Sequence, residues 1–148
     1  MDVFFEFLEP LHKQYTQLFK MSQFCILMPC NCAFVEDDEK YARFQEYIDH
    51  FKALDVDFHI SWSTDGKYMV DTREKRAVDD EYFERGFKLA EKYAFGIHPM
   101  IAAENIENAV ENYDWFVEEY AKYDLMRFEP PFLEVRNDNW TDEKIAHY

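Results

Sequence analysis

Short apolar runs alternate with longer segments of helical period along this chain. Each run has the length and the β-branched or aromatic content of a single strand, and strands are predicted at 24–28, 56–62, 95–100 and 125–128. The segments between them repeat apolar residues at spacings of three and four, which predicts helices that bury one face. These faces comprise Tyr41, Phe44, Ile48 and Phe51, then Phe83, Phe87, Ala90 and Tyr93, then Ile106, Val110, Tyr113, Val117 and Tyr120.

Polar residues and one proline indicate where several helices begin. Asp37 or Asp38 is the predicted N-cap of one helix, and Asp79 precedes another. Pro10 predicts the first turn of a helix ahead of the first strand, because proline is tolerated there. Thr141 indicates a last helix near the end of the chain.

The order of these elements predicts an α/β fold. The predicted strands start about 30 to 40 residues apart, which is the size of one βα unit. Such alternation implies a parallel sheet with right-handed crossovers and helices on its outer face. We therefore expect residues 1–148 to form one domain with about four parallel strands. Two architectures fit, a partial (βα) barrel and a small open doubly wound sheet, and the alternation alone does not choose between them.

The net charge of −15 excludes several classes of partner. A surface this acidic repels phosphate backbones and anionic lipids, so we expect no nucleic-acid and no membrane binding. No apolar run approaches the roughly 20 residues that span a bilayer, and no signal peptide is recognisable. A cytoplasmic protein is therefore expected. With only three glycines, the chain contains neither a G-x-G-x-x-G nor a P-loop motif.

Polar and reactive residues follow three of the predicted strands or, for His98-Pro99, lie within the third, near the ends where α/β folds bind their ligands. These segments are Pro29-Cys30-Asn31-Cys32, Ser63-Thr64-Asp65-Gly66, His98-Pro99 and Glu129-Pro130-Pro131. His98 and Glu129 are candidates for acid–base catalysis. A packed, hydrogen-bonded histidine and a loop carboxylate are the alternatives for these two residues.

Two of these segments resemble the radical S-adenosylmethionine (SAM) superfamily, in its peptide-modifying branch that often carries a SPASM extension. The stretch from Ile60 to Gly66, followed by arginines, resembles the fourth barrel strand and its S-x-D-G segment. The stretch from Ile26 to Cys32 is similar to the preceding strand, which commonly ends in T-N-G, although only Asn31 matches. Glu104-Asn105-Ile106 is similar to the helix start after the fifth strand. The resemblance covers roughly residues 1–135.

The resemblance implies roles in binding SAM for a few residues. Ser63 would contact the SAM ribose or carboxylate, and Arg73 or Arg76 would pair with the carboxylate. Asn31 would lie near the methionine end or the substrate. Asp65 belongs to the same binding segment, although Asp-Gly pairs also form simple turns. The substrate implied by the family is a peptide or protein.

The family also uses a 4Fe-4S cluster held by C-x-x-x-C-x-x-C, and this sequence contains no such motif and no G-G-E-like SAM segment. Cys25, Cys30 and Cys32 have the spacing C-x₄-C-x-C, from which we assign no metal site. Cys25 is expected to be a small buried core residue. Cys30 and Cys32 are either incidental loop thiols or a redox or metal pair. The chain is therefore expected to be a truncated or split barrel section that is inactive alone.

Two other functions fit the sequence. One is a non-catalytic α/β interaction domain, and the other is a small α/β enzyme that uses His98, Asp65 and Glu129 for acid–base chemistry. Apolar residues of the first two strands, such as Phe58 and Ile60, are expected to face or flank barrel strands that this sequence does not supply. Self-association or binding of an upstream fragment is therefore expected as well.

Overall fold

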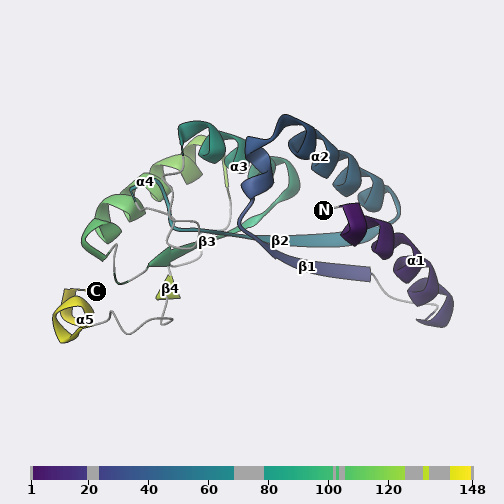
Figure 1. Ribbon diagram of the computed structural model, residues 1–148, viewed down its shortest axis with the longest axis horizontal. Helices are drawn as coiled ribbons and strands as arrows, with labels where there is room; N and C mark the ends of the chain where they lie inside the picture. Colours follow the sequence, from purple (N-terminus) through teal and green to yellow (C-terminus); the bar gives the residue numbers. More distant parts are fainter. Residues whose placement is uncertain are drawn as a thin grey trace. The chain divides into compact units, whose positions relative to one another are not determined.

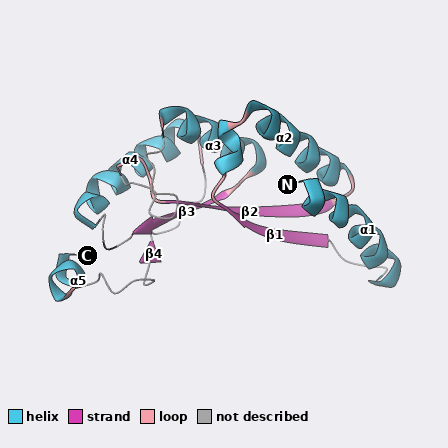
Figure 2. Cartoon of the chain, in the orientation of Figure 1, coloured by secondary structure: helices cyan, strands magenta, loops and turns pink. Residues whose placement is uncertain are grey.

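The computed structural model describes residues 2–19, 24–68, 79–101, 103, 106–125, 132–133 and 141–147. Helices and strands alternate along the chain, and the protein is an α/β protein with parallel strand pairs (Figure 1, Figure 2). The elements are α1 (Asp2–Phe19), β1 (Phe24–Cys30), η1 (Ala33–Glu36), α2 (Asp38–Ala53), β2 (Val56–Thr64), α3 (Asp80–Tyr93), β3 (Gly96–Ile101), η2 (Ile106–Asn108), α4 (Ala109–Lys122), β4 (Phe132–Leu133) and α5 (Asp142–His147). No described helix combines the length and the apolar character that a membrane span requires.

The chain divides into two compact units, one of residues 1–28 and 34–59 and one of residues 29–33 and 60–148. In the first unit, Phe5 of α1 is buried among aromatic rings. It stacks on Tyr47 of α2 with ring centroids 4.3 Å apart, and it also contacts Phe51 of α2 and Phe58 of β2. Because α1 and α2 both contact Phe58, the two helices cover the same face of β2.

The second unit is built around Trp62 of β2, whose side chain is fully buried. Its ring packs edge-on against Tyr82 and Phe87 of α3. Gly86 of α3 lies under the ring, and a Cβ at this position would overlap with the indole. Phe87 continues the cluster by packing against Trp115 of α4. The missing side chain at position 86 therefore allows α3 to approach the strand closely.

The strands follow one another in chain order, β1-β2-β3-β4. β2 pairs in parallel with β3, with Trp62 opposite Ile97 and Ser63 opposite His98. β3 pairs in parallel with β4, where Met100 lies opposite Phe132. Three strands are thus joined by parallel pairing, and the βα alternation that predicted them is confirmed at this level.

The strand β2 has one covered and one open face. Its even-numbered residues from Val56 to Thr64 are buried, and its odd-numbered residues from Asp57 to Ser63 are partly or largely exposed. This alternation follows from the two-residue period of a strand. The expectation that Phe58 and Ile60 face missing strands is wrong, because both are buried on the side of the helices.

The fourth strand lies at Phe132–Leu133, and the predicted run at 125–128 does not begin as a strand. Leu125 belongs to the C-terminal cap of α4, where its N–H donates to the carbonyl of Tyr120 at 3.0 Å, and Asp124 before it has a φ of 50°. This hydrogen bond ends the helix and takes the residue out of any strand. Residues 126–128 lie outside the described part of the chain.

Two helix predictions are also wrong. α1 begins at Asp2 and contains Pro10 in its interior. Phe5 and Leu8, which come before the proline in the chain, are buried. Their packing stabilises helical turns ahead of Pro10, where the sequence predicted that the helix had not yet begun. Of the three predicted helix faces, those of α2 and α3 are confirmed.

In α4, the predicted residues Val110, Tyr113 and Val117 are exposed, 72% in the case of Val110. Ile106 and Tyr120 are buried as predicted. The rest of the buried face consists of Asn112, Trp115 and Phe116. These residues are also spaced at three and four positions. The two large aromatic rings pack against α3, with Trp115 in contact with Phe83 and Phe116 in contact with Phe87. They bury more apolar area than two valines can, which decides the orientation of the helix.

Candidate functional site

Ser63 and His98 lie next to each other where the carboxyl end of β2 runs beside the middle of β3. They are direct partners in the parallel register, and the preceding pair of Trp62 and Ile97 is buried on the other face. Side chains of successive strand residues point to opposite faces. Ser63 and His98 are therefore on the open face, and both are half-buried there. A hydroxyl and an imidazole at this edge can hydrogen-bond a polar ligand and exchange a proton with it.

The segment after Ser63 forms a tight turn held by α4. The N–H of Gly66 donates to Oγ1 of Thr64 at 3.3 Å, and Gly66 has a φ of 92°. Nδ2 of the buried Asn112 donates to the carbonyl of Asp65 at 2.9 Å. A Cβ at Gly66 would overlap with the Asn112 amide, so this turn requires glycine for both its conformation and its space. Asp65 itself is buried.

Asn112 and a second asparagine extend this support to the next residues. The N–H of Tyr68 donates to Oδ1 of Asn112 at 3.4 Å, and Nδ2 of Asn108 donates to the carbonyl of Tyr68 at 2.9 Å. Of the two interpretations of Asp65-Gly66, the structure shows the turn. Sequence reasoning missed Asn112, although a polar residue three and four positions before Trp115 and Phe116 marks the true buried face of α4.

The loop after β1 is anchored to the start of α3 through Tyr82. Nε1 of Trp62 donates to the Tyr82 hydroxyl at 2.9 Å, and that hydroxyl donates to the backbone carbonyl of Asn31. Tyr82 is fixed in turn by the N-cap Asp79, whose Oδ1 accepts from the Tyr82 N–H at 2.9 Å. The side chain of Asn31 accepts from the N–H of Ala33 at 3.2 Å, which closes the loop on itself. Tyr82 is a second positioning residue that the sequence did not reveal.

Cys30 and Cys32 flank Asn31 and have different thiols. Sγ of Cys30 accepts from the backbone N–H of Cys32 at 3.1 Å. A hydrogen bond from the Cys32 side chain, opposed by partial burial, lowers the pKa of Cys30 to about 7. Burial raises the pKa of Cys32 well above its ordinary value, and the neighbouring Cys30 adds to this. Cys30 is therefore the nucleophilic thiol of the pair, since the thiolate is the reactive form.

The three cysteines do not fit an iron–sulfur cluster. Cys25 and Cys30 lie five residues apart in β1, which places them about 16 Å apart along the strand and on its opposite faces, so they do not converge on one cluster. The expectation that Cys25 is a core residue is wrong, because its side chain is exposed on the open side of β1. No step that passes through a cluster follows from these residues.

Four of the predicted site residues lie in the described part of the second unit, namely Asn31, Ser63, Asp65 and His98. The register places Ser63 beside His98, while Asp65 takes part in the turn and Asn31 lies in the loop that Tyr82 holds. Arg73, Arg76 and Glu129 lie outside the described residues. Comparisons of the chain with protein-family models, with curated proteins and with solved structures return no match.

Proposed function

We propose that the chain is a section of a radical SAM barrel, inactive alone, that binds SAM at the carboxyl end of β2 beside β3. The enzyme of which it is a section modifies a peptide or protein. The observation that carries the proposal is the pairing of Ser63 with His98 on the open face, at the carboxyl end of β2. Ligands of βα barrels bind at this edge. The strand order β1-β2-β3-β4 is the order that a barrel section requires.

The residues at this edge have distinct tasks under the proposal. The Ser63 hydroxyl hydrogen-bonds the SAM ribose or carboxylate, and Arg73 or Arg76 pairs with the carboxylate. The loop of Asn31, anchored by Tyr82, faces the methionine end or the substrate. His98 accepts or donates a proton beside the bound ligand, and Glu129 is the other candidate for this task.

SAM supplies a sulfonium, and this family cleaves one of its carbon–sulfur bonds by reduction. This chain contributes binding and orientation to that chemistry. The cluster that delivers the electron needs thiolates other than Cys25, Cys30 and Cys32. The proposal therefore concerns the binding of SAM, which the chain's own residues test directly.

Isothermal titration calorimetry of the full chain with SAM tests the proposal. We expect weak but measurable binding that Ser63→Ala weakens about tenfold to a hundredfold, because a hydrogen bond to a charged group contributes about 1.5–3 kcal/mol. Ser61→Ala is the matched control, since Ser61 lies on the same face two residues earlier and is also half-buried. Separate Arg73→Ala and Arg76→Ala variants then identify the arginine.

Two results would contradict the proposal. One is the absence of any SAM binding by the wild-type chain. The other is a Ser63→Ala variant that binds as tightly as the Ser61→Ala variant does, which would remove the residue on which the proposal rests.

A further inference from the structure

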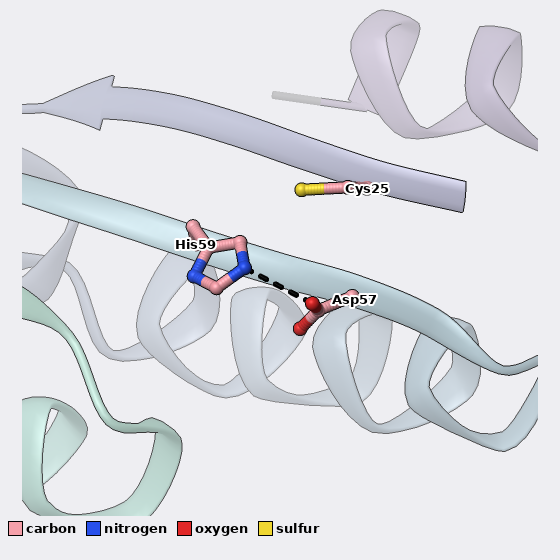
Figure 3. A group of neighbouring side chains, drawn as sticks. All are labelled: Cys25, Asp57 and His59. Atoms are coloured by element: carbon pink, nitrogen blue, oxygen red, sulfur yellow. Dashed lines mark hydrogen bonds and ion pairs between the residues drawn. The ribbon is translucent and has the colours of Figure 1, made fainter. Parts of the chain in front are cut away.

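The open face of the first unit brings together a thiol, a carboxylate and an imidazole. Cys25 belongs to β1, and Asp57 and His59 belong to the neighbouring strand β2. The Sγ, carboxylate oxygen and imidazole nitrogen of these residues all lie within 4.8 Å of one another. Figure 3 shows the three side chains on the two strands, with the hydrogen bond of 3.0 Å between Nε2 of His59 and Oδ2 of Asp57.

The backbone under these side chains is fixed by the core. Phe58 lies between Asp57 and His59, and its ring contacts Phe5 of α1 and Phe51 of α2 at centroid distances of 6.4 and 5.8 Å. Ile26, the neighbour of Cys25 on β1, is also buried. Because Asp57 and His59 are two residues apart in a strand, both point to the same face. The three Cα positions are thus set by packing on the opposite side, and only the side chains remain to adjust.

The donor set suits a borderline or soft metal ion. Zinc binds thiolate sulfur at about 2.3 Å and imidazole nitrogen or carboxylate oxygen at about 2.0–2.2 Å. Two donors on one tetrahedral ion therefore lie roughly 3.3–3.7 Å apart. The three donor atoms of this cluster lie within 4.8 Å of one another, which is close to this range. Rotations of the side chains alone can bring the donor atoms to these distances. Magnesium and calcium prefer an all-oxygen shell, and the thiol and imidazole do not fit them.

We infer that Cys25, Asp57 and His59 bind a divalent transition-metal ion of the zinc class. The side chains of His59 and Asp57 are 47% and 37% exposed, so an ion enters directly from solvent. Three protein ligands leave the fourth tetrahedral position to water or to another ligand, which is the arrangement of an open site rather than of a closed structural one. The site consists of first-unit residues alone and does not depend on the binding of SAM.

Titration of the chelator-treated full chain with Co(II) tests the inference, because cobalt replaces zinc and reports its ligands by absorption. We expect one ion per chain, a charge-transfer band that only a bound thiolate gives, and the intense visible bands of a four-coordinate ion. Cys25→Ser abolishes the charge-transfer band. Asp57→Asn and His59→Gln each weaken binding about tenfold or more. His50→Gln is the matched control, since this exposed histidine of α2 lies outside the cluster and its variant keeps the spectrum.

A second measurement keeps the test independent of the spectrum. Zn(II) at a hundredfold excess over its Kd raises the folding equilibrium constant of the wild-type chain about a hundredfold, seen as an increased midpoint of thermal unfolding. In Asp57→Asn and His59→Gln the same Zn(II) concentration raises the folding equilibrium constant only about tenfold or less, because each binds the ion about tenfold or more weakly. Their circular dichroism without metal stays that of the wild type because both side chains lie on the open face. A titration without stoichiometric Co(II) binding overturns the inference. A thiolate band that survives Cys25→Ser and disappears in Cys30→Ser overturns it as well.

Discussion

On one side of β2, Val56, Phe58, Ile60 and Trp62 are buried, Phe58 against rings of α1 and α2 and Trp62 against rings of α3. On the opposite side the same strand carries Asp57, His59, Ser61 and Ser63, which are polar and remain accessible. Apolar burial stabilises the fold, whereas polar side chains on a strand face add little stability unless they bind something. The two faces therefore separate what holds the strand in place from what the strand offers to ligands.

The largest effect on the free energy of unfolding is expected from a substitution on the covered face of β2. Trp62→Ala removes the fully buried indole from its contacts with Tyr82 and Phe87 and leaves a cavity over Gly86. We expect the free energy of unfolding to fall by about 3–5 kcal/mol. Urea denaturation followed by circular dichroism measures it.

Ser61→Ala is the control from the open face, and its free energy of unfolding should stay within about 0.5 kcal/mol of the wild type. Equal losses in both variants would show that the two faces of β2 do not differ in their contribution to stability.

A smaller effect concerns the turn that follows the strand. Asn112→Leu keeps the branched shape of the side chain and removes the hydrogen bonds to the carbonyl of Asp65 and from the N–H of Tyr68. A buried carbonyl then loses its partner, which costs about 1–3 kcal/mol of unfolding free energy. Thermal and urea unfolding measure the loss. Glu111→Ala, an exposed neighbour on α4, should leave stability almost unchanged. An Asn112→Leu variant more stable than the wild type would contradict the supporting role of the amide.

The strand pattern could be predicted because it depends on neighbours in the sequence. The alternation from Val56 to Trp62 and the spacing of Phe44, Ile48 and Phe51 each describe one element against one core. The failures depend on tertiary packing. Pro10 is tolerated inside α1 because the turns before it are buried, and α4 presents Trp115 to α3 where Val110 was expected.

The candidate sites show the same limit. Ser63 and His98 were recognised as strand-end residues, but their direct pairing follows from the register of β2 and β3. Cys25 is more than thirty residues away from Asp57 and His59 in the sequence, and no local spacing connects them. Only the pairing of strands brings the three together. The Asn112 amide and the Tyr82 hydroxyl hold backbone carbonyls of two loops, a task that no sequence motif marks.

The environment of Cys30 is seen best in the reactivity of its thiol. Because folding lowers the pKa of Cys30 to about 7, its thiolate contributes stability that is present above the ordinary pKa near 9 and is lost as the pH falls through 7. Above the ordinary thiol pKa, the raised pKa of Cys32 acts with the opposite sign. The rate of alkylation by iodoacetamide, measured by mass spectrometry, follows the thiolate directly.

In a Cys25→Ser background, which removes the exposed thiol of the open face, we expect alkylation of Cys30 to rise with a midpoint near pH 7. Cys32→Ala removes the side-chain hydrogen bond that stabilises the thiolate and should move the midpoint upward. The backbone N–H of residue 32 still donates to Sγ, so the pKa returns only part of the way to its ordinary value. A midpoint near 9 in the parent protein would show that Cys32 does not stabilise the thiolate. The loop after β1 would then contain a thiol of ordinary pKa. The remaining reactive groups of β1 and β2 would be the side chains on the open face.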